Sequence, residues 1–264
     1  MHTPLCKHAR GEPGEYASVA ERRGLAGIVV TCHNPTNDGW SPDVRMSLAE
    51  FDQYVAMVEN ARQEWMGRVD IRLGIESDYI PGMELWLETL HRMAEFHHVL
   101  GSVHPHLKDY RDRFYTGDFA AYVETYFDHL AMAAETGLFD TIAHPDLVKN
   151  VSPDQWDLMR AMDSICPSLD RIARVGIAME LNTARLNTEF GEVCPNKPML
   201  SEMLKRNIPI VLGADAHDPS RVAIDFESAL DILSGIGYTK IHIFLDRQRR
   251  EILISDVRDQ LRKI

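Results

Sequence analysis

The chain has 264 residues, 45% of them hydrophobic and 26% charged, and its 40 acidic side chains against 28 Lys and Arg give a net charge of −12. This composition excludes a disordered or fibrous protein, and the length suits one domain with a sizeable core. The negative field argues against long nucleic acid as a partner, although bound cations would reverse the field locally for a small phosphate ester.

The sequence also argues against a membrane or secreted protein. No apolar run approaches the roughly 18 residues that span a bilayer, and the start, Met1 to His8, lacks the apolar core of a signal peptide. The four cysteines form no C-x-x-C pair, which disfavours a disulfide framework or a thiolate zinc site. We therefore expect a cytoplasmic protein; the sequence leaves its oligomeric state open.

Short apolar runs alternate with longer amphipathic stretches along the chain. The runs are rich in β-branched residues and too short for helices, as expected of buried parallel strands; they cover 27–31, 71–75, 99–103, 141–143, 176–181, 208–213 and 240–245. Helix-like segments lie at about 13–23, 48–65, 83–96, 118–136, 153–174, 197–206 and 219–235. About seven strand–helix units predict an α/β fold, a parallel sheet closed into a barrel, with residues 1–264 as a single domain.

Metal-capable side chains stand where the predicted strands end. They are His33, Glu76, His104, His144, Asp215 and His217, together with His2 and His8 at the start, where a first strand would end. Because the carboxyl ends of parallel barrel strands open on one face, we expect these eight side chains to converge there. Taken singly, Glu76 could instead form a salt bridge at the barrel mouth, and Asp215 could cap the following helix.

The remaining histidines have ordinary structural interpretations as surface or hydrogen-bonded residues. They are His91 and His129 within predicted helices, His242 in a late strand, and His97 and His98 before a strand. His106 is interpreted in the same way, but it lies only two residues beyond His104, so a place in the site stays open for it.

Histidine and carboxylate ligands without cysteine suit Zn, Mn, Fe or Co, so we expect two or three divalent ions as cofactors. A carboxylate that bridges two cations can hold a hydroxide between them, while the cations neutralise phosphoryl oxygens. This chemistry hydrolyses a phosphate ester without a side-chain nucleophile.

Seven segments, in order along nearly the whole chain, resemble the PHP (polymerase and histidinol phosphatase) superfamily and, within it, the histidinol-phosphatase branch. They are His2-Thr3-Pro4-Leu5-Cys6-Lys7-His8, Thr31-Cys32-His33-Asn34-Pro35, Gly74-Ile75-Glu76-Ser77-Asp78, Gly101-Ser102-Val103-His104, His144-Pro145-Asp146-Leu147, Glu180-Leu181-Asn182-Thr183 and Gly213-Ala214-Asp215-Ala216-His217. The resemblance implies a distorted seven-stranded (β/α) barrel of the PHP type and a role in histidine biosynthesis.

The resemblance also implies a trinuclear metal site. One metal would be held by His2, Glu76, Asp215 and a further His; a second by Glu76, as a bridge, with His104 and His144; and a third by His8, His33 and His217.

Two departures from the family pattern stand out. The family motif begins His-x-His, but here Met1 takes the middle position and the first His has no counterpart, so the first strand is expected to be truncated by a late start. Otherwise the Met1 amine or water would substitute as ligand. Cys32 stands where the family usually has Asp; it would not orient His33 as a carboxylate does, and it is either a soft ligand or a buried bystander.

We therefore predict a metal-dependent phosphoesterase for a small phosphomonoester, with L-histidinol phosphate suggested by the resemblance. Glu76, Asp215 and His144 are the predicted catalytic residues: a hydroxide on the Glu76-linked metals attacks phosphorus, and Asp215 or a nearby His protonates the leaving alkoxide. The alternatives are a nucleotide or short-oligonucleotide phosphoesterase on the same fold, and a metal-poor, non-catalytic binding protein.

Phosphate recognition needs cationic groups, and Arg gives bidentate contact. Arg185, Lys149 and Arg45 are the best placed, each with the alternative of an ordinary solvated cation. Residues 35–47, which include Trp40, are expected to form a loop over the site.

Overall fold

The computed structural model describes residues 1–186 and 191–262. In this part of the chain the strands form one sheet in sequence order: β1 (Gly27–Val30), β2 (Asp70–Asp78), β3 (His98–Ser102), β4 (Thr141–Ile142), β5 (Ala178–Asn182), β6 (Ile210–Gly213), β7 (Lys240–Leu245) and β8 (Gln248–Leu253). Neighbours from β1 to β7 pair in parallel, whereas β8 returns antiparallel to β7. The seven predicted parallel strands are confirmed; β8 was not predicted.

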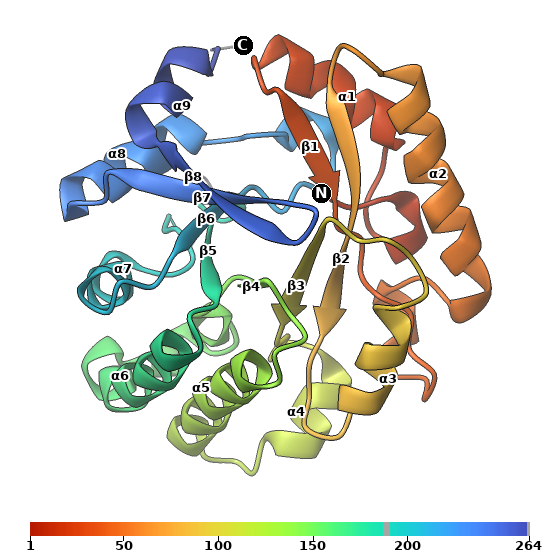
Figure 1. The fold of residues 1–264 in the computed structure, drawn as a ribbon. Coiled ribbons are helices and arrows are strands. Elements are labelled where there is room, and N and C mark those ends of the chain that lie inside the picture. Colours follow the sequence, from red (N-terminus) through yellow and green to blue (C-terminus); the bar gives the residue numbers. More distant parts are fainter. Residues whose placement is uncertain (187–190, 263–264) are drawn as a thin grey trace.

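Helices surround this sheet on the outside (Figure 1). They are α1 (Pro13–Arg22), α2 (Phe51–Glu64), α3 (Glu84–Leu90), α4 (Lys108–Phe114), α5 (Phe119–Glu135), α6 (Leu158–Val175), α7 (Lys197–Lys205), α8 (Phe226–Ile236) and α9 (Ile254–Gln260). The helix expected at 83–96 ends early, at Leu90, and the one expected from 219 begins at Phe226; α4 and α9 were not predicted. No helix within the described ranges is long and apolar enough to cross a membrane.

The ends of α5 and α6 follow from local chemistry. The Asp118 carboxylate caps α5 by accepting hydrogen bonds from the amides of Ala120 and Ala121, and Asp157 caps α6 through the amide of Arg160. Helix α6 ends at Gly176, whose φ of 76° lies in the left-handed region that glycine adopts without strain. The buried face of α5 includes Tyr122 and Tyr126.

The sheet is open between β1 and the β7–β8 hairpin, since no pairing among the described strands joins them. The first two residues connect the segment after β1 with the segment after β6. The Met1 carbonyl accepts a hydrogen bond from the Thr31 amide at 2.8 Å, and the His2 amide donates to the Ala216 carbonyl at 2.9 Å. The N-terminus thus lies at the centre of the ring of helices (Figure 1). A cavity of about 440 Å³ extends from the gap to Glu76 and His144.

Tyr54 of α2 fixes the carboxyl end of β1. Its buried hydroxyl lies 2.9 Å from the Val30 carbonyl oxygen and 2.7 Å from that of Gly74, and accepts a hydrogen bond from the Cys32 amide at 3.2 Å. One phenol therefore connects β1 and β2 immediately before His33.

Replacing Tyr54 with Phe is expected to lower the free energy of unfolding by about 1–3 kcal/mol, because the Cys32 amide and the carbonyls of Val30 and Gly74 lose a buried partner. Urea unfolding would measure the change. Tyr115→Phe, at a side chain that is 37% exposed, is the control and should stay within about 0.5 kcal/mol of the parent. Equal stability of the two variants would contradict the role given to Tyr54.

Candidate metal centre

The carboxylate of Glu76, on β2, is buried among four imidazoles. Its Oε1 lies 3.0 Å from His144 Nε2 and 3.2 Å from His104 Nε2. Its Oε2 lies 3.3 Å from His2 Nε2 and 3.6 Å from His33 Nδ1. Only 3% of Glu76 is exposed, so these rings take the place of water around a buried charge.

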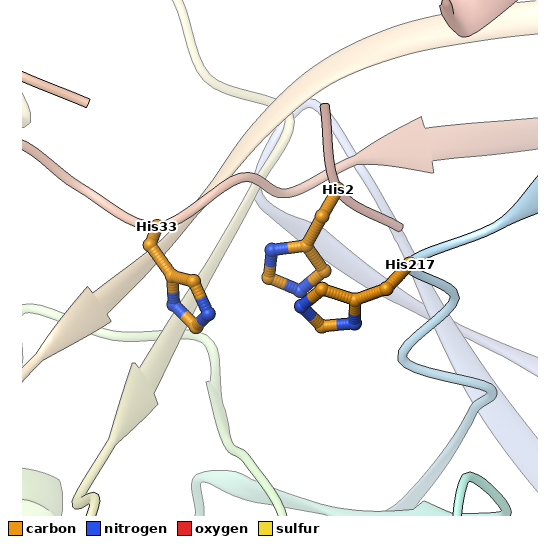
Figure 2. Close-up of side chains that lie close together, drawn as sticks. All are labelled: His2, His33 and His217. Atoms are coloured by element: carbon orange, nitrogen blue, oxygen red, sulfur yellow. The ribbon is translucent and has the colours of Figure 1, made fainter. Parts of the chain in front are cut away.

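The other predicted ligands adjoin this group. Asp215 Oδ1 lies 3.0 Å from His2 Nε2. The His217 ring stacks on His2 with centroids 3.9 Å apart and on His8 at 4.6 Å. Figure 2 shows His2, His33 and His217 pointing toward a common space. The structure therefore brings all eight predicted side chains together.

Two of these residues have an unusual backbone. His144, after β4, and Asp215, after β6, have φ values of 38° and 47°, in the left-handed region that side chains other than glycine rarely adopt. Such a conformation costs of order 1–3 kcal/mol and persists only where the surroundings impose it. At His144 the amide donates to Glu180 Oε2 at 3.1 Å, which helps to hold the turn.

The charges in the cluster are strongly coupled. Burial would raise the pKa of Glu76, but His33, His104, His144 and His2 outweigh it and leave that pKa well below its usual range. Burial likewise opposes protonation of His104, but Asp78 and Glu76 raise its pKa to about 10. Without metal, protonated imidazoles therefore neutralise the carboxylates.

The donor set fits divalent metal ions. Among the described residues, five groups of potential ligands have their donor atoms within 4.8 Å of one another, and three of them contain only histidine and carboxylate: His2–Glu76–Asp215, His33–Glu76–His104 and His2–His33–His217. Among the predicted ligands that the structure describes, four ring nitrogens are buried without a hydrogen-bond partner: His2 Nδ1, His33 Nδ1, His144 Nδ1 and His217 Nε2. Imidazole and carboxylate donors at this spacing are typical of Zn and related transition metals.

The two departures from the motif have structural counterparts. The Met1 amine donates to Thr31 Oγ1 at 3.0 Å. Cys32 lies beside His2 rather than orienting His33. Its Sγ is within 4.8 Å of a donor atom of both Cys6 and His2, and it accepts a hydrogen bond from Thr3 Oγ1 at 3.2 Å. Burial opposes ionisation of this thiol, but hydrogen bonds with Cys6 and His2 outweigh burial and lower the pKa of Cys32.

Of the three predicted substrate-binding cations, Arg185 lines a pocket of about 400 Å³ together with His33, His104 and His217. Lys149 is 6% exposed, and its ammonium group donates to Asp146, Glu192 and the Val193 carbonyl. This geometry does not support the substrate-binding role that we predicted for Lys149, because its three donors are already used.

Arg45 also lines the pocket, but it is 2% exposed and its guanidinium lies 2.5 Å from Asp78 Oδ2. The geometry therefore does not support a substrate-binding role for Arg45 either. The buried Asp78 and Glu180 were not among the predicted site residues, although both stand inside segments that match the family, Gly74–Asp78 and Glu180–Thr183, a signal that could have pointed to them.

Sequence reasoning also missed several side chains that line the pocket. They include His106, which had been given an ordinary structural interpretation, and Asn182 and Arg221. Arg221 follows β6 in a short 3-10 turn, Pro219–Arg221, where the sequence gives no signal of function.

Metal binding is expected to strengthen as pH rises, because a ligand histidine must lose its proton first. With the pKa of His104 at about 10 in the metal-free protein, protons compete at that site throughout the neutral range. Each displaced proton should raise the apparent Zn²⁺ affinity about tenfold per pH unit below that pKa. Calorimetry in buffers of different ionisation enthalpy would count the protons; binding without proton release at pH 7 would contradict this.

Comparisons with known proteins agree with this geometry. The family model described as "PHP domain" matches residues 1–184. The chain is 34% identical over 247 residues to a Deinococcus radiodurans protein named "Probable histidinol-phosphatase", which covers 90% of this chain and 92% of the relative. It is 26% identical over 261 residues to a Bacillus subtilis protein named "Histidinol-phosphatase", covering 88% of this chain and 97% of the relative.

Among solved structures, a histidinol phosphate phosphatase from Lactococcus lactis, complexed with zinc, L-histidinol and phosphate, superposes with a TM-score of 0.80. The match covers 95% of this chain and 97% of that one at 16% sequence identity, and so shows a shared fold. With the PHP model spanning well over half of the sequence, and a relative above 30% identity along nearly its whole length, the chain belongs to the PHP domain family.

Proposed function

We propose that this protein is a metal-dependent phosphatase that hydrolyses L-histidinol phosphate to L-histidinol and inorganic phosphate. The observation that carries the proposal is the Glu76 carboxylate, which lies within 3.0–3.6 Å of four imidazoles beside an open pocket. The relatives named histidinol-phosphatase, which match about 90% of the chain, support the choice of substrate.

The metal ligands that we propose are the eight converging residues. They are His2, His8, His33, Glu76, His104, His144, Asp215 and His217. Two or three divalent ions held there would lower the pKa of a bound water and offset the charge on the phosphoryl oxygens. The protein would contribute a fixed ligand geometry and a site from which most water is excluded.

Hydrolysis transfers a water oxygen to phosphorus, breaks the bond between phosphorus and the ester oxygen, and requires a proton on the leaving alkoxide. Burial would raise the pKa of Asp215, but its hydrogen bond with His2 and the neighbouring His217 outweigh burial and hold that pKa well below its usual value. An ionised Asp215 accepts protons and binds cations. We therefore assign it a ligand or base role in place of the proton-donor role considered from sequence.

Phosphate recognition is assigned to two arginines that line the pocket. Arg185 was expected from sequence; Arg221 was not, and its guanidinium donates to the carbonyl of Ala184, the residue before Arg185, at 2.8 Å. Arginine suits phosphate because its planar fork can donate two parallel hydrogen bonds.

Replacing Glu76 with Gln is expected to lower metal content and to reduce turnover by more than about 100-fold, a larger loss than an outer-shell residue gives. The amide keeps the shape of the side chain but removes the charge that the metals share. Metal analysis and phosphate release from L-histidinol phosphate, a simple phosphomonoester and a short single-stranded oligonucleotide would measure this.

Glu88→Gln, at an exposed residue of α3, is the matched control and should behave as the parent. Preference for the oligonucleotide would replace the proposed substrate by the nucleic-acid alternative. Parental protein that holds less than about one metal per chain after Zn or Mn addition, without turnover, would favour the non-catalytic alternative.

Replacing Arg185 or Arg221 with Met is expected to lower kcat/KM for the phosphate ester by about 10–100-fold, since a hydrogen bond to a charged group contributes about 1.5–3 kcal/mol. The loss should appear mainly in KM, and metal content should stay parental. Arg22→Met, at an exposed position on α1, is the control. Unchanged steady-state kinetics in both pocket variants would refute the assignment.

A further inference from the structure

A buried carboxylate that the proposed reaction does not use lies behind His104. Asp78 lies two residues beyond Glu76 on β2 and is 2% exposed. Its Oδ1 lies 2.7 Å from His104 Nδ1. Since Nδ1 donates its proton to Asp78, Nε2 is the nitrogen that faces the cluster, 3.2 Å from Glu76 Oε1.

The second oxygen of Asp78 is held by the loop of residues 35–47. Its Oδ2 accepts hydrogen bonds from Arg45 Nη2 at 2.5 Å and from Trp40 Nε1 at 3.1 Å. Both donors are buried: Arg45 is 2% exposed and Trp40 is 8% exposed. The loop that the sequence placed over the site therefore contacts the Asp78 carboxylate, which in turn contacts the predicted ligand His104.

The remaining donors of Arg45 are directed into the protein. Its Nε donates to the Ser41 carbonyl at 3.1 Å, and its Nη1 lies 3.1 Å from both the carbonyl and the Oδ1 of Asn34. Asn34 Oδ1 in turn accepts from the Asp78 amide at 3.0 Å. Arg45, Asn34 and Asp78 thus form a closed hydrogen-bonded ring around the carboxylate.

The loop is also anchored on its other side. Ser41 donates from its amide and its hydroxyl to Asp109 Oδ2, at 2.7 and 3.0 Å, and Asp109 belongs to α4. The position of the guanidinium is therefore set by Asp78 on β2 and, through Ser41, by Asp109 on α4.

We propose that Arg45 is a positioning residue: it fixes the Asp78 carboxylate so that His104 presents Nε2 to the metal centre, and it thereby couples the seating of loop 35–47 to metal affinity. The inference rests on the proposed metal-dependent function, but it concerns retention of the ion and not recognition of the substrate. Mutation of a residue that orients a ligand histidine commonly weakens metal binding by about 10–100-fold.

The physical basis is the cost of an unpaired buried charge. Without the guanidinium, Asp78 would keep the hydrogen bonds from Trp40 and His104 but lose the permanent positive charge beside Oδ2. The carboxylate would then turn toward other donors, and the His104 ring would lose its fixed acceptor. The ligand would be present but no longer held in the orientation that binds metal.

The test measures Zn²⁺ affinity by competition with a chromophoric chelator, without substrate, in full-length Arg45→Met, Asp78→Asn and the double variant. Each single variant should weaken one Zn²⁺ of the centre by about 10–100-fold. The double variant should bind no more weakly than Asp78→Asn, because both changes act through His104. Steady-state kinetics should show a lower kcat with little change in KM.

Arg23→Met is the matched control, because Arg23 is also buried and paired with a carboxylate, Glu227, but lies away from the cluster. It should lower thermal stability and leave Zn²⁺ affinity unchanged. If Arg45→Met does not fold, Trp40→Phe removes the other loop donor and should weaken the same Zn²⁺ by several-fold.

Parental Zn²⁺ affinity together with a raised KM in Arg45→Met would overturn the proposal and return Arg45 to a substrate-binding role. Additive losses in the double variant would also contradict it. Failure of the proposed phosphatase function would look different: the parental protein would show no phosphate release, while its Zn²⁺ affinity would still depend on Arg45.

Discussion

The structure depends on one buried negative charge, the carboxylate of Glu76. A carboxylate that is 3% exposed is unfavourable unless it is paired, and here four histidines from the chain start, β1, β3 and β4 surround it. Without metal, protons on His2, His104 and His144, whose pKa values are raised by the neighbouring carboxylates, supply the compensating charge. Divalent ions would replace those protons, so that metal binding, proton release and stability of the cluster are parts of the same equilibrium.

A second set of residues holds the first in place. Tyr54 connects the end of β1 with the middle of β2, Glu180 accepts from the His144 amide, and the Arg45–Asp78 pair fixes His104. Each of these groups is buried and hydrogen-bonded, so its own position is well determined. The left-handed backbone at His144 and Asp215 is tolerated because the surrounding contacts impose it.

Packing also explains the surroundings of Cys32, one of the two departures from the family motif. Cys32 sits where a carboxylate was expected, but its partners are Thr3, Cys6 and His2, in a fully buried space. Burial raises the pKa of the Cys32 thiol, but the neighbouring Cys6 and His2 outweigh burial and lower it.

The sequence alone determined the parallel strands and the converging ligands. Strands buried on both faces must be continuous apolar runs, and parallel strands must open at the same end, so local pattern and topology were sufficient for the eight side chains. The β8 strand, Gln248–Leu253, was not predictable because its residues are largely exposed and carry little apolar pattern. The partners of long cations were not predictable either. Arg45 reaches Asp78, and Lys149 reaches Glu192 as well as the nearby Asp146; Asp78 and Glu192 come near these cations only in the folded chain, because the direction of a flexible side chain depends on neighbours distant in sequence.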